Sequence, residues 1–248
     1  HPQTIDRYSW IQNSYKKYPN CKYKLNPNIQ KRFELIKAKL FAYTHSQAEV
    51  LAVYQNQIST SSKYASAAAN FFNGDKKKSI DMIKSLIKDD PSNPYYHEIL
   101  GEIYYTLGNF KLAILEQKKT MELLSSDNDL HLMMLGSYLI AESSDENITK
   151  SIKTLNKSLF LNRTNSYAWY LLAKAHALNN NLALAQYASA ERYYLRRDKA
   201  LALSFAKKAI KNIDKDTVEW YRTNDLIQLI VGIEEKDNKN RSKDIKND

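Results

Sequence analysis

Residues 100–113, Leu-Gly-Glu-Ile-Tyr-Tyr-Thr-Leu-Gly-Asn-Phe-Lys-Leu-Ala, place the turn Gly108-Asn109 between two segments whose apolar residues recur at helical spacing. A second glycine turn, Gly74-Asp75, stands 34 residues earlier and has the same kind of segment on each side. A single helical hairpin cannot bury its apolar face, so hairpins that repeat at this period stack and share a continuous core. The period therefore predicts an all-α solenoid of helical hairpins.

The period and the residue pattern are typical of the tetratricopeptide repeat (TPR). Leu100-Gly101, Tyr104 and Ala113 fall at the small and large positions where the two helices of a TPR hairpin approach each other. A later repeat shows the same pattern around Trp169, with His176 in the place of the tyrosine. The pattern thus predicts a TPR-like fold, which is a fold that binds other proteins.

Four hairpins and the start of a fifth fit between Ser61 and Ile213. Their helices are predicted at Ser61–Asn73 and Lys76–Lys88, at Pro94–Leu107 and Phe110–Leu124, at Asp129–Ala141 and Ile148–Leu161, and from Tyr167 to the Asn179–Asn181 turn followed by Leu182–Arg196. The next turn, Arg197-Asp198, comes only 17 residues after Asn180, which is half a repeat. Helix Leu182–Arg196 is therefore expected to close the fourth hairpin and to open the fifth, with Ala200–Ile213 as its partner.

Other segments are predicted to flank the repeats. Residues 1–58 form an N-terminal helical module, with helices expected at Thr4–Tyr18, from Pro27 onward and up to Gln57. Residues 59–234 form the TPR superhelix, and its last helix, from Thr217 to about Glu234, is expected to cap the exposed end of the solenoid. Residues 235–248 are charged and are predicted to be a disordered tail.

The composition limits what the chain can bind. The single cysteine, Cys21, excludes an internal disulfide framework and a cysteine-based zinc site. No apolar run approaches the roughly 18 residues that span a bilayer, so no transmembrane segment is expected. The net charge of +10 has two explanations: an acidic partner, or the Lys- and Asn-rich usage of an AT-rich genome. The basic pairs are scattered along the chain, which favours the second explanation.

No catalytic centre is predicted in this chain. His97-Glu98-Ile99-Leu100-Gly101 is similar to the start of a zinc-protease helix, but that motif needs a second histidine where this chain has Gly101. The other histidines lack metal-ligand spacing. The sequence also has no Gly-rich phosphate loop and no Gly-x-Ser-x-Gly elbow. We therefore expect neither catalysis nor a cofactor in this chain.

The inner surface of the solenoid is the predicted binding site. The first helix of each TPR hairpin lines a concave groove, and its inward residues recur at helical spacing. Rigid aromatic side chains bury area at low entropic cost, and a Glu and a Lys can orient a peptide backbone. The predicted groove residues are Tyr64, Phe71, Tyr95, Glu98, Tyr105, Met133, Tyr170 and Lys174. The alternative for each ring is that it packs between hairpins.

Three stretches carry a resemblance to a known family. The first, His1-Pro2-Gln3-Thr4-Ile5-Asp6-Arg7, resembles an H-P-x-T-x-D-R element that follows a protease core. The second, Phe33–Lys39, resembles the short apolar helix after that element, and the third runs from Asn179 to Ile210 and includes the half-repeat spacing. Together they resemble the C-terminal half of the bacterial periplasmic zinc metalloproteases with appended TPRs, the BepA (YfgC) type. The resemblance covers the chain apart from its charged tail.

The resemblance implies a parent protein that acts as a protease and chaperone-like factor in outer-membrane protein quality control, in the periplasm. Its zinc and the H-E-x-x-H helix that holds it would lie upstream of His1. His1 itself either lies near that zinc as a metal-site residue or is part of a simple turn. The implied partners are unfolded or assembling polypeptide, outer-membrane assembly proteins and the parent's own protease domain in cis.

Three functional hypotheses remain open at this point. The chain is the interaction arm of a zinc metalloendopeptidase, or a stand-alone TPR scaffold or chaperone adaptor, or a basic helical repeat that binds RNA. An RNA-binding repeat needs basic residues gathered on one face together with aromatic rings for stacking. The predicted groove is mixed in charge, so no nucleic-acid partner is expected. An H-E-x-x-H motif upstream in the same reading frame would separate the first two hypotheses.

Overall fold

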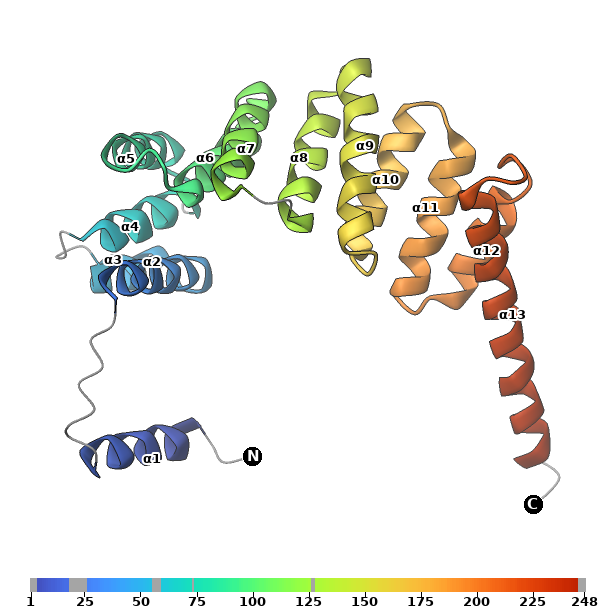
Figure 1. Cartoon of the computed structure of the whole chain (residues 1–248), viewed down its shortest axis with the longest axis horizontal. Helices are drawn as coiled ribbons and strands as arrows, with labels where there is room; N and C mark the ends of the chain where they lie inside the picture. The colour runs from blue at the N-terminus through green and yellow to red at the C-terminus, as the bar shows by residue number, and fades with distance from the viewer. Residues whose placement is uncertain (1–3, 18–25, 55–58, 73, 126–127, 245–248) are drawn as a thin grey trace. The chain divides into compact units, whose positions relative to one another are not determined.

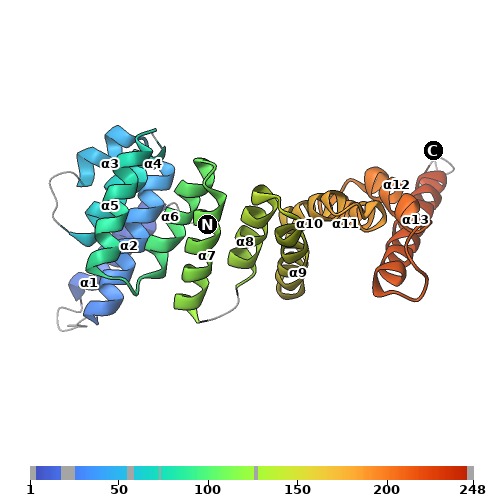
Figure 2. The same ribbon diagram turned by 90° about the horizontal axis from the view of Figure 1, so that it is seen from above.

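The computed structural model describes residues 4–17, 26–54, 59–72, 74–125 and 128–244 of the chain. Every regular element within these residues is an α-helix (Figures 1 and 2), which confirms the all-α prediction. The first five helices are α1 (Thr4–Lys17), α2 (Pro27–Thr44), α3 (Gln47–Tyr54), α4 (Thr60–Phe72) and α5 (Lys76–Asp89). The next four are α6 (Pro94–Thr106), α7 (Phe110–Leu124), α8 (Asp129–Glu142) and α9 (Asp145–Leu161). The last four are α10 (Ser166–Leu178), α11 (Leu182–Leu195), α12 (Lys199–Ala209) and α13 (Val218–Asp244).

The chain divides into two compact units, His1–Met82 and Ile83–Asp248, with the boundary inside α5. In the first unit, α4 packs against both α2 and α3. Leu35, Ala38 and Ala42 of α2 are buried, and so are Val50 of α3 and Tyr64 of α4. None of the residues of α1 is buried. The core of the first unit is therefore built by α2, α3 and α4.

The second unit is a stack of helical hairpins. Helices α6 and α7, α8 and α9, and α10 and α11 pack closely in pairs, while α7–α8 and α9–α10 contacts join one pair to the next. Helix α11 packs as closely against α12 as against α10, which confirms that it closes one hairpin and opens the next. Helix α13 contacts α12 and α11, and so lies at the end of this stack, as a capping helix does.

Helix α11 belongs to two apolar clusters at once. Its Ala188 packs in a cluster that contains Leu155 of the preceding hairpin and Leu172 of its own hairpin. Its Ala190, two residues later, packs in a second cluster with Ala202 and Ala206 of α12. Fully buried alanines allow the backbones of packed helices to approach, so α11 can be covered on both sides. This helix therefore joins the cores of neighbouring hairpins.

Asparagines begin the first helices of the hairpins. The side-chain oxygens of Asn93, Asn128 and Asn165 accept hydrogen bonds from backbone N–H groups of α6, α8 and α10, with Tyr95, Leu130 and Tyr167 as donors at 3.2, 2.9 and 3.1 Å. Such N-caps satisfy amides that have no partner within the helix, and each contributes about 1 kcal/mol. Part of the Asn-rich composition is therefore a structural signal that recurs in these three hairpins.

Two helices differ from the sequence prediction. Helix α9 begins at Asp145 instead of Ile148, since Asp145 and Glu146 place negative charges in the first turn, where the helix dipole favours them. Helix α13 continues to Asp244 through residues that were predicted to be a disordered tail. No Gly or Pro follows Gly232, so no helix-breaking residue ends this helix earlier.

Candidate functional site

The structure divides the predicted groove residues between the two units. Tyr64 and Phe71 belong to the first unit and are 0% and 6% exposed, because α2 and α3 pack on α4. These two rings are part of a core and offer no surface to a partner. The other six residues belong to the second unit: Tyr95, Tyr170 and Lys174 are exposed, and Glu98, Tyr105 and Met133 are half-buried. The predicted metal residue His1 lies outside the described residues.

The first helices of the hairpins carry exposed apolar residues at equivalent positions. Tyr95, Leu130 and Tyr167 each stand two residues after the capping asparagine of α6, α8 or α10. Their side chains are 36%, 53% and 52% exposed. The sequence prediction contained the first of these and missed Leu130 and Tyr167. The repeated capping asparagine is the signal that would have found them.

Four tyrosines from three helices form the main aromatic surface, here called the tyrosine face: Tyr105, Tyr138, Tyr167 and Tyr170. The rings of Tyr105 and Tyr138 stack with 4.8 Å between their centroids, and those of Tyr167 and Tyr170 lie 5.7 Å apart. Burial raises the pKa of the Tyr167 hydroxyl, and so do the nearby hydroxyls of Tyr105 and Tyr170. Side chains of α6, α8 and α10 are thus brought together, although Tyr105 and Tyr167 are far apart in sequence.

Tyr138 is the buried member of the tyrosine face and was not predicted. Its side chain is 3% exposed, and its hydroxyl has no hydrogen-bond partner within the described part of the chain. Burial raises the pKa of this hydroxyl well above its usual range, and the carboxylates of Glu102 and Glu98 raise it further. Tyr138 is therefore a neutral phenol that stacks against the Tyr105 ring.

The residues similar to a zinc-protease motif have structural roles. His97 is 9% exposed, and its Nδ1 lies 2.7 Å from Oε2 of Glu116 on α7. A Cβ on Gly101 would lie 3.4 Å from the carbonyl oxygen of Ala113, so this glycine marks a close approach of α6 and α7. Among the described residues, no group of three or more His, Cys, Asp or Glu side chains could hold a metal ion.

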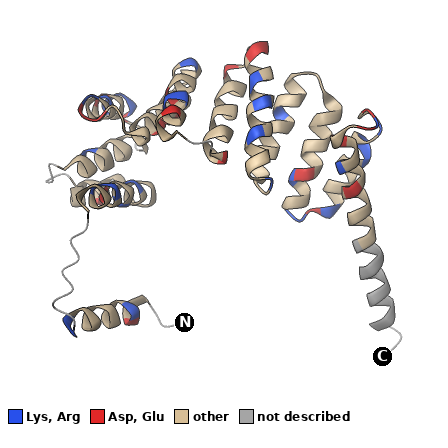
Figure 3. Ribbon diagram, in the orientation of Figure 1, with Lys and Arg blue, Asp and Glu red and all other residues tan. Residues whose placement is uncertain are grey.

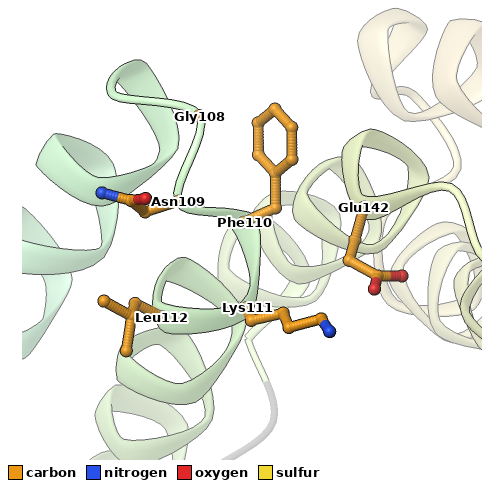
Figure 4. Close-up of a pocket in the computed structure, with 6 residues that line it drawn as sticks. All are labelled: Gly108, Asn109, Phe110, Lys111, Leu112 and Glu142. Carbon is orange, nitrogen blue, oxygen red and sulfur yellow. The ribbon is translucent and has the colours of Figure 1, made fainter.

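A hollow of about 360 Å³ lies beside the turn between α6 and α7. Figure 4 shows Phe110 and Lys111 from the start of α7, with Glu142 from the end of α8 opposite them. The Glu142 carboxylate accepts hydrogen bonds from Ser144 and Asn147, which lower its pKa to about 2. That carboxylate already serves the α8–α9 turn, so the hollow is a weaker candidate than the tyrosine face.

The distribution of basic residues does not indicate a second candidate site. Figure 3 shows Lys and Arg spread over α5, α7, α9 and α12. The described helices include none that is long and apolar enough to cross a membrane.

Comparisons with known proteins agree with the hairpin architecture. No protein-family model and no curated protein sequence matches the chain. Among solved structures, the C-terminal part of a TPR repeat-containing protein from Cytophaga hutchinsonii is 16% identical, with 91% of each chain covered and a TM-score of 0.53. MamA MSR-1 is 15% identical, with 68% of this chain and 98% of that chain covered and a TM-score of 0.55. The fold is that of a TPR solenoid. At these identities the likeness concerns the fold alone.

Proposed function

We propose that the second unit is a protein-interaction module that binds an extended polypeptide segment on the tyrosine face. The observation that carries the proposal is that Tyr105 of α6 lies near Tyr167 and Tyr170 of α10, while Tyr167 and Tyr170 remain 52% and 37% exposed. Contiguous exposed apolar side chains on a soluble protein mark interaction surfaces. Tyrosine combines a rigid ring with a hydroxyl, which suits the recognition of a peptide backbone at low entropic cost.

The finer proposal is that this module is the TPR arm of a BepA-type zinc metalloendopeptidase in envelope and outer-membrane protein quality control. Its support is the His1–Arg7 element, the segment Phe33–Lys39 and the half-repeat spacing within Asn179–Ile210. The partners would be unfolded or assembling polypeptide, outer-membrane assembly proteins or the protease domain of the same protein, in the periplasm. Zinc would belong to that protease domain and not to this chain.

The second candidate function is a stand-alone TPR scaffold or chaperone adaptor. It needs no protease domain and uses the same tyrosine face. An H-E-x-x-H motif upstream of His1 in the same reading frame supports the protease arm, and a reading frame without that motif supports the scaffold. The binding activity proposed for the tyrosine face is common to both.

The proposed binding activity is tested with fluorescein-labelled casein as an unfolded polypeptide probe, read by anisotropy. The double variant Tyr105→Ala with Tyr170→Ala is expected to weaken binding at least tenfold, while its helical circular dichroism stays close to that of the wild type. The matched control is Phe160→Ala on α9, because Phe160 is 89% exposed and lies on the second helix of its hairpin. Equal affinities of all three proteins would rule out the tyrosine face as the binding site.

A further inference from the structure

Cationic and aromatic side chains alternate across α10, α11 and α12. The Arg192 guanidinium lies over the ring of Tyr170 at 4.6 Å and over the ring of Tyr193 at 5.3 Å. Tyr193 in turn stacks on Phe205, with 5.4 Å between centroids and 8° between ring planes, and the Lys208 ammonium lies 5.6 Å from the Phe205 ring centroid. With Tyr167 beside Tyr170, these six residues form what is here called the cation–aromatic ladder.

The half-repeat arrangement of α11 accounts for the ladder. Helix α11 is the second helix of its hairpin, yet it also packs fully against α12. Because α11 stands between α10 and α12, a residue near its end, Arg192, can reach rings on the helix before it and on its own helix. The ladder is thus continuous with the tyrosine face through Tyr167 and Tyr170.

Arg163, in the same unit, has a carboxylate partner that Arg192 of the ladder does not have. Arg163 lies 5.4 Å from the ring of Trp169 and is also paired with the carboxylate of Glu191. The Arg163 guanidinium therefore has both an aromatic ring and a carboxylate as partners. By contrast, neither Arg192 nor Lys174, one turn after Tyr170, makes an ion pair with any carboxylate in the described part of the chain.

The N–H donors of a guanidinium lie in its own plane and point outward from its edge. Those donors form a fork that matches the two oxygens of a carboxylate, and such paired hydrogen bonds are about twice as strong as neutral ones. The neighbouring ring faces of Tyr167 and Tyr170 can receive a flat side chain of the same ligand. The ladder is therefore complementary to a group that presents a carboxylate beside a planar residue.

We propose that the cation–aromatic ladder binds a carboxylate of a polypeptide ligand next to an aromatic residue, with Arg192 as the main contact and Lys174 as a second cation. The proposal rests on the polypeptide-binding function of the tyrosine face and names its specificity. Two sources supply this chemistry: an Asp or Glu side chain within the polypeptide, and its C-terminal carboxylate.

The test uses fluorescein-labelled nine-residue peptides with two central phenylalanines. The first peptide has Glu between the two phenylalanines and a C-terminal amide. The second, neutral peptide has Gln in place of that Glu and the same C-terminal amide. The third peptide also has Gln, but it ends in Phe with a free C-terminal carboxylate. The wild-type protein is expected to bind at least one carboxylate peptide tenfold more tightly than the neutral one, and the preferred peptide identifies the source. Equal affinity for all three peptides would overturn the proposal.

Variants assign the preference to Arg192. Arg192→Gln is expected to abolish the tenfold preference, while Arg192→Lys keeps the charge and retains part of the preference. Lys174→Gln reduces the preference by a smaller factor. The matched control is Arg196→Gln, at the exposed residue that directly follows α11, and it keeps the full preference. A tenfold preference that survives in Arg192→Gln contradicts the proposal.

The same measurements separate this proposal from the binding function on which it rests. Casein binding that depends on Tyr105 and Tyr170, together with equal peptide affinities, removes only the carboxylate specificity. Casein binding that does not depend on those tyrosines removes the binding function of the tyrosine face, whatever the peptides show.

Discussion

Gly136 marks a close contact between α8 and α9. A Cβ at this position would lie 2.6 Å from Cγ and 2.7 Å from Cδ2 of Leu155, whose side chain is fully buried. Gly136→Ala is therefore expected to lower the free energy of unfolding by about 1–3 kcal/mol through overpacking. Urea denaturation followed by circular dichroism measures the change.

Gly232→Ala is the matched control for Gly136→Ala. Gly232 also lies inside a helix, α13, but a Cβ there would meet nothing within 4 Å. Alanine is the better helix former by roughly 1 kcal/mol, so this variant is expected to be as stable as the wild type or more stable. If Gly136→Ala is also stabilising, α8 and α9 do not approach as closely as the structure has them.

His176 makes stability depend on pH. Its side chain is 8% exposed, and burial lowers the pKa of its imidazole, with Glu219 acting in the opposite direction. The unfolded chain then binds the proton more readily, with a pKa of about 6.5. The contribution of neutral His176 to the free energy of unfolding is therefore complete above about pH 6.5, and it is lost as the pH falls below that value.

The expected result is a melting temperature that drops between pH 7.5 and pH 5.5. His176→Leu is expected to flatten this dependence, since no buried imidazole has to stay neutral. His45→Gln, at an exposed position, should leave the dependence as it is in the wild type. A pH dependence that persists in full in His176→Leu would show that other groups cause it.

At the scale of elements, the packing of α11 on both neighbouring helices can be tested by substitution. Ala188 faces one apolar cluster and Ala190 another, and both side chains are fully buried. Ala188→Leu and Ala190→Leu are each expected to cost about 1–3 kcal/mol through overpacking. The measurement is urea denaturation of each single variant. If either variant unfolds at the same urea concentration as the wild type, α11 does not pack on both neighbours.

The positions of helices and turns can be predicted from the sequence where neighbouring residues determine them. They are less predictable where contacts with distant segments determine them. The 17-residue spacing to the Arg197-Asp198 turn indicated the double role of α11, because turn positions are written in the sequence. The repeated capping asparagines, such as Asn93, are also local signals, although the abundance of Asn in the chain hides them. The start of α9 differs from the apolar pattern by three residues, because Asp145 and Glu146 extend the helix ahead of its first apolar residue, Ile148.

The candidate site was predictable only in part. Helical spacing placed Tyr105 and Tyr170 on first helices, and the structure places both in the tyrosine face. The same spacing selected Tyr64, which is buried because α2 and α3 cover α4. Spacing within one helix cannot tell which of its faces a distant segment will cover. For the same reason the sequence did not indicate Tyr138 or the approach of Arg192 to Tyr170.

The molecule as a whole divides its charge unequally between the units. Residues 1–82 contain thirteen Lys and Arg and five Asp and Glu, a net charge of +8, whereas residues 83–248 contain twenty-four and twenty-two, a net charge of +2. The unit that carries the tyrosine face is thus close to neutral. Its polypeptide binding is expected to weaken only modestly between 50 mM and 300 mM salt, in contrast to binding dominated by phosphate contacts. Anisotropy titrations with labelled casein at the two salt concentrations measure this.

The whole chain is expected not to hydrolyse peptides. A zinc-protease helix needs a second histidine four residues after the first, and the residue four positions after His97 is Gly101. His97 itself is engaged with Glu116. Incubation of the pure protein with casein and added zinc should give no cleavage products on a gel, and chelator-sensitive cleavage would contradict this.

Site-specific photocrosslinking tests the central claim most directly. A benzophenone amino acid replaces Tyr167 on the tyrosine face or, as the control, Phe160 on α9, and both side chains are more than half exposed. Each protein is mixed with fluorescein-labelled casein and irradiated, and crosslinked product is quantified on a gel. The account predicts a strong crosslink from position 167 and little from position 160. Equal crosslinking from the two positions, or crosslinking from position 160 alone, would contradict it.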